Sequence, residues 1–488
     1  MVPSVPCLRI QAANNAPVRA DGNYVLYWMI ANRRAQWNYS LDRAVEWCEE
    51  LRKPLLILEA VRCDYPWAGD RIHRFILQGM ADNRHHFSGK SVRYYPYVET
   101  EAAAGKGLVE AFAAQASVVV TDDFPCFFLP RMVSKVANRL SVKCESIDSN
   151  CLLPLRAADR VFTRAYDFRR WLHKNLAPFL EDAPQEDPLV DFTFPVADVS
   201  VDIVDHWPEA SDKLLTATPK ILSGLPIDHQ VFPAVIDGGA SAGSKVIHYF
   251  FTDRLARYAD DRNNAENEAA SHFSPYLHFG HLSAHEVFAR IVQREQWTPA
   301  ELAETGKGAR EGWWGMSREA ESFLDQLITW RELGYNMSWQ NDKYMEFESL
   351  PEWAQTTLAS HSSDPREYVY DLPEFEAAVT HDEVWNAAQR QLVRDGRMHN
   401  YLRMLWGKKI LEWSATPRDA LAVMIELNNK YAVDGRNPNS YSGIFWVLGR
   451  YDRAWGPERP VFGKIRYMSS QNTRRKLKLK EYLKRYSG

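Results

Sequence analysis

The chain lacks the features of exported, membrane-bound and disulfide-stapled proteins. It has six cysteines in 488 residues and no CxxC pair, so neither a disulfide framework nor a four-cysteine iron–sulfur site is indicated. It has no run of about twenty apolar residues, and its N-terminus has no basic segment followed by an apolar core. Membrane insertion and export are therefore disfavoured, and we expect a cytoplasmic protein.

The chain also lacks an excess of charge of one sign. Lys and Arg number 59 against 63 Asp and Glu, which gives a formal net charge of −4. The overall charge thus does not indicate a nucleic-acid partner, which would have to meet a local basic patch. The segment RRKLKLKEYLKR (474–485) is such a patch, although a solvated terminal helix explains the same residues.

Short β-rich runs alternate with helical stretches in the N-terminal part of the chain. The runs are YVLYWMI (24–30), PLLILEA (54–60) and SVVVT (117–121). Between them lie helical patterns such as LDRAVEWCEELR (41–52) and LVEAFAAQ (108–115). This alternation predicts βαβ units and therefore an α/β domain with a doubly wound, Rossmann-like parallel sheet.

The length of the chain predicts more than one domain, because a single core of this size is uncommon. After an N-terminal tail (1–20) and the α/β domain (21–150), the pattern dissolves into Pro- and Asp-containing segments, which predicts a long interdomain linker over 151–225. Residues 226–488 then show apolar residues three and four apart, as in FLDQLITWRELGYN (323–336). We expect this C-terminal domain to be all-helical.

Two patterns are only superficially similar to familiar ligand sites. GGASAGSK (238–245) differs from a phosphate-binding loop because its Lys does not directly follow the second spaced Gly and no strong strand leads into it. His278, His281 and His285 have helical metal-ligand spacing, but no acid or cysteine completes the set nearby. We expect neither a nucleoside triphosphate nor a metal at these positions.

Residues 398–446 mix aromatic, basic, acidic and amide side chains more densely than a folded core needs. The two blocks are MHNYLRMLWGKKILEW (398–413) and LNNKYAVDGRNPNSYSGIFW (427–446), whereas cores prefer plain aliphatics. Such a mixture suits a pocket for a large, flat cofactor. Upstream, Ser271 and Ser274 bracket a turn into SPYLHFG that is suited to anion binding, and an ordinary capped loop fits it equally well.

Together these blocks resemble the photolyase/cryptochrome family, and specifically the class II cyclobutane pyrimidine dimer (CPD) photolyases. The match runs from about residue 24 to 485, and its most specific segments are SPYLHFGHLS (274–283), WNAAQ (385–389), the two blocks above, and DRAW followed by FGKIRYM (452–468). The resemblance implies a deoxyribodipyrimidine photo-lyase, a light-driven flavoenzyme that uses reduced FAD to split a dimer flipped out of UV-damaged DNA. It leaves open which antenna chromophore the N-terminal domain binds, and we expect a monomer.

The resemblance places the cofactor site on particular residues of this chain. In the family a tyrosine and a serine-rich turn hold the FAD phosphates, an arginine and an aspartate flank the flavin ring, and an asparagine lies near flavin N5. The matching residues are Tyr258, Ser271, His272, Phe273, Ser274, Arg403, Asp434 and Asn428. A buried anionic flavin needs a compensating cation, and arginine stays charged when desolvated. A structural salt bridge between Arg403 and Asp434, with no flavin, is the competing interpretation.

Three tryptophans resemble the electron relay of class II enzymes. The resemblance puts Trp406 nearest the flavin, Trp385 in the middle and Trp413 at the surface. Trp406 and Trp413 are seven residues apart, so they lie on one face of a helix. Because the chain has 17 tryptophans, an ordinary aromatic core is the competing interpretation.

The resemblance also implies where DNA and the lesion bind. Trp330 and Trp446 correspond to the rings that sandwich the flipped dimer, and Met404 to a methionine that packs under it. Flat rings suit splayed bases, because stacking replaces what the bases lose on leaving the duplex. The residues that would fill the emptied duplex or meet phosphates are Arg453, Trp455, Lys464 and Arg466.

One substitution departs from the family pattern at the lesion pocket. Gln326 stands where the family has a glutamate, four residues before Trp330. Glutamine keeps an N–H donor but cannot deliver a proton to the developing radical anion, so repair should suffer more than binding. The substitution keeps open a cryptochrome-like blue-light photoreceptor with weak or no repair activity. A non-catalytic DNA-binding protein with a vestigial cofactor site is a further alternative.

Overall fold

The computed structural model describes residues 5–488, which form two compact units. The first, the sheet unit, comprises residues 5–158, 176–248 and 273–300. The second, the helical unit, comprises residues 159–175, 249–272 and 301–488. Within the described part of the chain, no helix has the length and apolar character needed to cross a bilayer.

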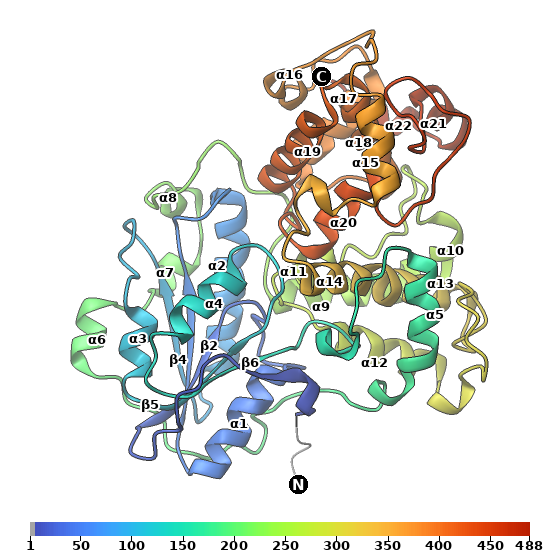
Figure 1. Ribbon diagram of the computed structural model, residues 1–488. Coiled ribbons are helices and arrows are strands. Elements are labelled where there is room, and N and C mark those ends of the chain that lie inside the picture. The colour runs from blue at the N-terminus through green and yellow to red at the C-terminus, as the bar shows by residue number, and fades with distance from the viewer. Residues whose placement is uncertain (1–4) are drawn as a thin grey trace. The chain divides into compact units, whose positions relative to one another are not determined.

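The sheet unit is built on six strands in the order β1-β6-β5-β2-β3-β4 (Figure 1). The strands are β1 (Ile10–Ala12), β2 (Tyr24–Met29), β3 (Leu55–Val61), β4 (Arg93–Val98), β5 (Ala116–Asp122) and β6 (Cys144–Ile147). All neighbouring pairs are parallel except β1 with β6, where Ile10 lies opposite Ile147. The predicted parallel, doubly wound sheet is confirmed, with one antiparallel edge strand added.

Both faces of the sheet are covered by helices. Successive side chains of a strand point to opposite sides, so apolar strands present apolar side chains to both layers of helices. Val25 and Tyr27 of β2 pack in a core cluster with side chains of α1 (Tyr39–Leu51). On the opposite face Tyr24 donates its hydroxyl to a carbonyl of α3 (Leu108–Ala113). Double coverage explains why these strands read as nearly continuous apolar runs.

Further helices complete the sheet unit (Figure 1). They are α2 (Asp70–Phe87), α4 (Leu129–Ala137), α6 (Val201–His206), α7 (Asp212–Leu215), α8 (Pro219–Leu222), most of α9 (Ala240–Tyr249), α11 (Ser274–His278) and α12 (Ala284–Glu295). The compact units thus do not follow the predicted boundaries. The tail 1–20 supplies β1, the linker 151–225 contains short helices, and residues 226–248 and 273–300 pack in the sheet unit. Local periodicity shows that a segment is helical but not which partner it packs against.

The two superficial ligand patterns have structural roles in the sheet unit. Gly239 has φ 95° and donates its N–H to His281 at 2.9 Å. A Cβ on Gly238 would lie 2.0 Å from the carbonyl oxygen of Phe75, so the glycines permit a close approach to α2. His285 contacts the carbonyl of Cys151 at 3.1 Å.

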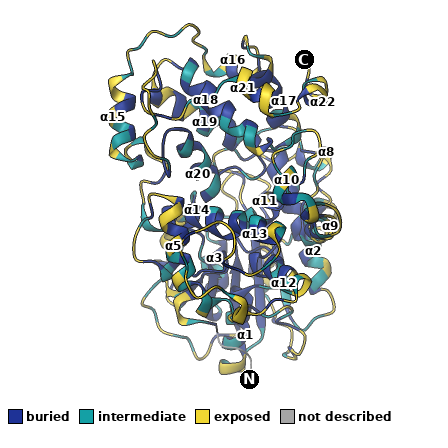
Figure 2. Cartoon of the chain, turned by 90° about the vertical axis from the view of Figure 1, so that its right-hand side faces the viewer, coloured by how far each residue is buried: buried dark blue, intermediate teal, exposed yellow. Residues whose placement is uncertain are grey.

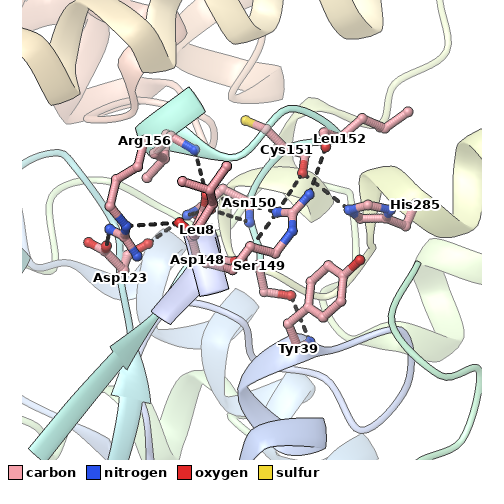
Figure 3. A network of polar contacts seen from close by, with 12 residues as sticks. Leu8, Tyr39, Asp123, Asp148, Ser149, Asn150, Cys151, Leu152, Arg156 and His285 are labelled. Atoms are coloured by element: carbon pink, nitrogen blue, oxygen red, sulfur yellow. Dashed lines mark hydrogen bonds and ion pairs between the residues drawn. The ribbon is translucent and has the colours of Figure 1, made fainter. Parts of the chain in front are cut away.

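A buried arginine ties the N-terminal segment to the loop after β6. Arg9 donates to the carbonyl oxygens of Asp148, Cys151 and Leu152 at 2.6 to 3.2 Å. Figure 3 shows Asp148, Cys151 and Leu152 of this loop close together, with His285 at the carbonyl of Cys151. Because the arginine is fully buried, each of these hydrogen bonds compensates a desolvated donor.

The helical unit consists of helices and their connecting loops, as predicted. Its α-helices are α5 (Ala165–Asn175), α10 (Tyr258–Asp261), α13 (Arg318–Leu324), α14 (Arg331–Gln340), α15 (Glu352–Ser360), α16 (Leu372–Glu376), α17 (Glu383–Asp395), α18 (Asn400–Trp413), α19 (Pro417–Tyr431), α20 (Pro438–Val447), α21 (Ser470–Lys476) and α22 (Lys480–Arg485). Two π-helical segments, η4 (Phe250–Arg254) and η7 (Asp325–Trp330), interrupt the α-helical pattern.

Candidate functional site

Helix α18 forms the centre of the candidate site in the helical unit. His399 caps its N-terminus, and Arg403 and Trp406 follow four and seven residues later. Residues spaced by four and three lie on the same face of an α-helix, so the three side chains succeed one another along one face. Trp406 is 2 % exposed, and Arg403 is half-buried.

Arg403 and Asp434 are brought together but not locked to each other. Arg403 Nη2 lies 3.8 Å from Asp434 Oδ1, and the side chains are 27 % and 12 % exposed. A bidentate arginine–carboxylate pair would have N–O distances of about 2.7 to 2.9 Å. The wider spacing favours a shared contact with a third group over a structural salt bridge.

The turn that carries Asp434 is held by buried amides and hydroxyls. Ser440 donates its hydroxyl to the carbonyl of Asp434 at 2.8 Å. Asn428 is 3 % exposed and donates its amide to Asn429 Oδ1 at 3.2 Å, and Asn429 in turn donates to the hydroxyl of Tyr441. These bonds fix Asn428 and Asp434 relative to each other.

Two buried polar side chains beside Trp406 and Arg403 have nitrogen atoms without a partner. Gln389 accepts the indole N–H of Trp406 at 2.9 Å, but its Nε2 makes no hydrogen bond within residues 5–488. The same holds for both ring nitrogens of His399. Burial lowers the pKa of His399, so the ring is neutral near pH 7. An unsatisfied buried polar group costs about 1 to 3 kcal/mol, so these atoms fit a ligand with polar edges, such as a flavin.

The residues that were predicted to bind the FAD phosphates differ in their burial and in their contacts. Tyr258 is buried, with its ring centroid 5.4 Å from that of Phe323, and burial raises its pKa to about 12. His272 has φ 62° and already contacts Arg397 at 2.9 Å and Glu268 at 3.4 Å.

The serine-rich turn divides between the two units. Ser271 is half-buried in the helical unit, whereas Phe273 and Ser274 belong to the sheet unit. There Phe273 is buried and Ser274 is exposed as the first residue of α11. Phosphate binding by this turn stays a prediction.

The three relay tryptophans lie close together in α17 and α18. Trp385 donates its indole N–H to the carbonyl of Trp406 at 3.0 Å, and the ring centroids of Trp385 and Trp413 are 6.1 Å apart. Trp413 was expected at the surface, but its side chain is only 3 % exposed. It lies beneath Tyr370 and His381, whose ring centroids are 5.8 and 4.8 Å from its own.

The two tryptophans of the predicted lesion pocket stack on each other. The ring centroids of Trp330 and Trp446 are 4.6 Å apart and the ring planes differ by 16°. A base between them would require ring planes roughly 7 Å apart, twice an ordinary carbon–carbon contact distance. Both rings are half-buried, as is Met404 on α18. The rings themselves therefore fill the space that the prediction gave to the dimer.

Gln326 and Trp330 lie on a π-helical segment rather than on a regular turn. In η7 the i to i+5 hydrogen bond widens each turn, so the four-residue spacing no longer puts the two side chains directly above each other. The expectation of a regular i, i+4 pair is wrong. Because π-helical insertions depend on tertiary packing, the apolar periodicity of 323–336 gave no sign of this one.

Exposed cations gather on the loop after α20 and on the last two helices. Trp455 lies between two guanidinium groups, that of Arg453 at 4.8 Å and that of Arg466 at 5.2 Å from its ring centroid. Lys464 is exposed and contacts Glu458 at 3.3 Å. Helices α21 and α22 carry the basic segment 474–485 and are largely exposed (Figure 2). Such a set of cations suits a polyanion.

The structure adds a buried lysine that the sequence had not singled out. Lys408 is 1 % exposed, donates to the carbonyl of Val447 beside Trp446, and burial lowers its pKa to about 7. Two adjacent lysines, Lys408 and Lys409, in an otherwise apolar helix were the available signal, because both cannot face away from the core. Gln389 and His399 were not singled out as site residues either.

Comparisons with known proteins find relatives that match nearly the whole chain. No family model matches the chain. The chain is 33 % identical over 482 residues to the deoxyribodipyrimidine photo-lyase of Methanothermobacter thermautotrophicus, with 98 % of both proteins covered. It is 32 % identical over 474 residues to the deoxyribodipyrimidine photo-lyase of Arabidopsis thaliana, with 94 % of this chain and 88 % of that protein covered.

Solved structures give the same fold at lower sequence identity. A cryptochrome of Synechocystis sp. PCC6803 matches with a TM-score of 0.66 and 15 % identity, covering 97 % of this chain and 89 % of its own. A class III photolyase of Agrobacterium tumefaciens matches with a TM-score of 0.62 and 15 % identity, covering 97 % and 86 %. At this identity the likeness concerns the fold alone.

Proposed function

Because the chain belongs to the photolyase/cryptochrome family, we propose a function that starts from the activity of its full-length relatives. The chain is a deoxyribodipyrimidine photo-lyase, and it acts on UV-damaged DNA. The finer assignment is to the class II type, with a cyclobutane pyrimidine dimer as the lesion. The observation that supports the proposed flavoenzyme is one face of α18. On this face His399, Arg403 and Trp406 follow one another beside buried polar atoms that lack partners in residues 5–488.

Reduced FAD is the proposed cofactor, held by Arg403, Asp434 and Asn428, with Tyr258 and the turn 271–274 on its phosphates. When bound and illuminated, it supplies the single electron that opens the cyclobutane ring. Arg403 contributes a positive charge that persists on desolvation. The 3.8 Å Arg403–Asp434 spacing is wide enough for both side chains to share a contact with the ring.

The three tryptophans have the proposed role of restoring the reduced state after accidental oxidation. Electrons pass inward from Trp413 to Trp385 and then to Trp406, over the ring contacts described above. Gln389 holds the indole of Trp406 in one orientation through its 2.9 Å hydrogen bond. Burial of all three rings excludes water from the path.

The stacked pair Trp330–Trp446 is the proposed lesion platform. The splayed dimer displaces the contact between the two rings, and each ring then stacks on a base instead of on its partner. One ring–ring contact is thus replaced by two ring–base contacts. This exchange offsets part of the free-energy cost of flipping the dimer out of the duplex. Gln326 donates a hydrogen bond to a dimer carbonyl from η7, and Met404 packs below.

Cations near Trp455 have the proposed role of binding the duplex. Arg453 and Arg466 flank this ring, and all three lie on the segment after α20. Lys464 and Arg466 are exposed, and the exposed contact of Lys464 with Glu458 can be exchanged for a phosphate. Trp455, which donates its indole N–H to Asp452 at 3.0 Å, is the ring proposed to fill the emptied duplex.

A second function, blue-light signalling without repair, is favoured by one specific observation. Gln326 cannot supply the proton that a glutamate would supply to the opening ring. The retained Trp330, Trp446 and Met404 argue for repair, because a photoreceptor has no need of a stacking platform. The two functions share the cofactor and differ in turnover on damaged DNA.

The deciding experiment is a repair assay with the reduced protein. It is mixed with an oligonucleotide that carries one thymine dimer and illuminated with blue light, and the recovery of thymine absorbance is followed. We expect multiple turnovers in the light and none in the dark. Trp446→Ala should lose dimer binding at unchanged flavin content, whereas Trp446→Phe, which keeps a flat ring, should retain most of it. Bound, reduced flavin without any recovery would favour the photoreceptor.

A further inference from the structure

A surface pocket in the helical unit adjoins the outer end of the tryptophan relay. Its volume is about 430 Å³, and it lies between the segment 365–368, the last turn of α18 and the segment 459–467. Trp413 forms part of its lining. Trp413 is 3 % exposed in all and the pocket borders its ring, so a molecule held in the pocket lies next to the outer end of the relay.

The walls of the pocket are flat aromatic rings that carry cations on their faces. His381 lies 4.8 Å from Trp413 and stacks on Tyr368 at 3.7 Å between ring centroids, with 19° between the ring planes. Lys409 Nζ lies 5.2 Å from the Trp413 ring and 5.8 Å from the Tyr467 ring. Rings of this kind bind planar ligands by stacking.

The charges of the pocket favour an anion. Arg366 is anchored through Nη1 to the carbonyls of Ser362 and Asp364 at 3.3 and 2.9 Å, while Nε and Nη2 have no partner among residues 5–488. Those two nitrogens form the edge of a guanidinium that binds a carboxylate or enolate in bidentate fashion. Arg459 adds a second guanidinium, 4.9 Å from the Tyr467 ring.

The acidic residues of the pocket do not cancel these charges. Glu412 is engaged by Lys409 at 2.5 Å, so that pair contributes little net charge. Glu367 is exposed, and beyond it the lining carries Arg366 and Arg459. A small anion thus meets a net positive, ring-lined cavity.

We propose that this pocket binds a planar organic anion that donates one electron, of the enediolate or hydroquinone class, and that it refills Trp413. The inference rests on the proposed relay. After Trp413 has given an electron inward it is a radical cation; the bound anion transfers one electron to it through their ring contact. The indole is then neutral again, and the donor, now a radical, releases its hydroxyl proton to water. Atoms and electrons balance with the anion as the only reductant.

The test uses the full-length flavin-loaded protein and two donors, the ascorbate anion and the neutral dithiothreitol. In the dark, binding of ascorbate is followed by calorimetry, and in the light the rate of flavin reduction is followed against donor concentration. We expect saturable ascorbate binding and a light-driven rate that saturates at the same concentration. The rate with dithiothreitol should rise linearly, because a neutral, non-planar donor meets the relay only by collision.

Variants of the two pocket arginines test whether ascorbate binds in this pocket. Arg366→Gln and Arg459→Gln should each weaken ascorbate binding by about tenfold or more, as expected for loss of a charged hydrogen bond. Arg474→Gln, on α21 and paired with Glu383, is the matched control and should change nothing. Arg459 is exposed, so its variant folds even where Arg366→Gln does not.

Several outcomes would overturn the inference. These are the absence of saturable binding, binding unchanged in both pocket variants, and equal competition by inorganic phosphate, which would mean an anion site without selectivity for a planar donor. Trp406→Phe, at a position outside the pocket lining, separates this inference from the relay itself, since it should slow photoreduction and leave dark binding intact. Dark binding with no photoreduction in the wild type would instead refute the relay.

Discussion

Two buried polar clusters, one in each unit, differ in how fully their hydrogen bonds are satisfied. In the sheet unit the carboxylate of Asp122, at the end of β5, accepts five hydrogen bonds of 2.8 to 3.2 Å, from the backbone of Ile30, Ala31 and Asn32 and the side chains of Tyr27 and Asn32. In the helical unit, Gln389 and His399 keep nitrogen atoms without partners in the described chain. The first cluster has its hydrogen bonds satisfied within the protein, whereas the second keeps donors and acceptors that the proposed flavin would engage.

The largest effect is expected from breaking the hydrogen-bonded cluster around Asp122. Asp122→Ala leaves several buried donors without an acceptor, and we expect it to lower the free energy of unfolding by about 3 to 5 kcal/mol or to prevent folding. Urea unfolding measures the change. Asp21→Ala, at an exposed position, is the control and should stay close to wild type. A loss below 1 kcal/mol at Asp122 would mean that the cluster is not a structural element.

The second prediction concerns the proposed flavin site in the helical unit, to which Asp434 belongs. Asp434→Asn keeps the size of the side chain but removes the charge that faces Arg403, and we expect the purified variant to retain at most about a tenth of the flavin, a change of about 1.4 kcal/mol or more in binding. Thermal unfolding of the flavin-free proteins should be nearly equal, because the 3.8 Å contact with Arg403 contributes little stability. Full flavin content in the variant would contradict the assignment.

The third prediction separates the relay from the binding site. Trp406→Phe keeps a ring in the core but removes the easily oxidised indole, so light-driven reduction of the flavin should slow by an order of magnitude or more while flavin content stays the same. Repair by chemically reduced protein should be unchanged. Trp297→Phe, in the sheet unit, is the control. Undiminished photoreduction in Trp406→Phe would show that electrons take another path.

The fourth prediction concerns the residue that departs from the family pattern. Gln326→Glu restores a carboxyl group on η7, and we expect repair yield per absorbed photon to rise severalfold because the group can protonate the opening dimer. Dimer affinity, measured in the dark, should change less than the yield. An unchanged yield would show that a carboxyl proton is dispensable in this pocket.

The last prediction is a pH dependence of stability at Lys408. Its pKa is lowered by burial to about 7 from an ordinary value of 10.5, so between these values the unfolded chain binds more protons than the folded one. Stability therefore gains up to about 1.4 kcal/mol per pH unit as pH rises through this window. Lys408→Met should remove this gain in urea unfolding across the window, and the exposed Lys478→Met should not. Parallel pH profiles of wild type and Lys408→Met would contradict the burial.

The strands of the sheet could be predicted where burial makes a strand uniformly apolar, and not elsewhere. The runs at 24–30, 54–60 and 117–121 became β2, β3 and β5. Three strands were not predicted: β1 is short and lies in the predicted tail, and the other two contain residues that normally interrupt a strand. β4 is an edge strand that tolerates Pro96, and β6 contains Glu145, whose carboxylate is satisfied by Arg43 and Trp47.

The candidate site could be predicted in its residue types but not in its geometry. Arg403 and Asp434 were identified by resemblance, and the structure brings them together. The direct stacking of Trp330 on Trp446 could not be foreseen, because it depends on how η7 and α20 meet in space. The unpartnered atoms of Gln389 and His399 are likewise a property of packing that no sequence motif encodes.

The central claim is that a flavin binds beside Arg403, Asp434 and Trp406 in the helical unit. The most direct measurement is the amount of FAD released on denaturing the purified protein, relative to the amount of protein. We predict a yellow preparation that releases close to one FAD per chain, and a flavin-free protein that regains this value when incubated with FAD. A colourless preparation that takes up no FAD, with the chain otherwise folded, would contradict the account.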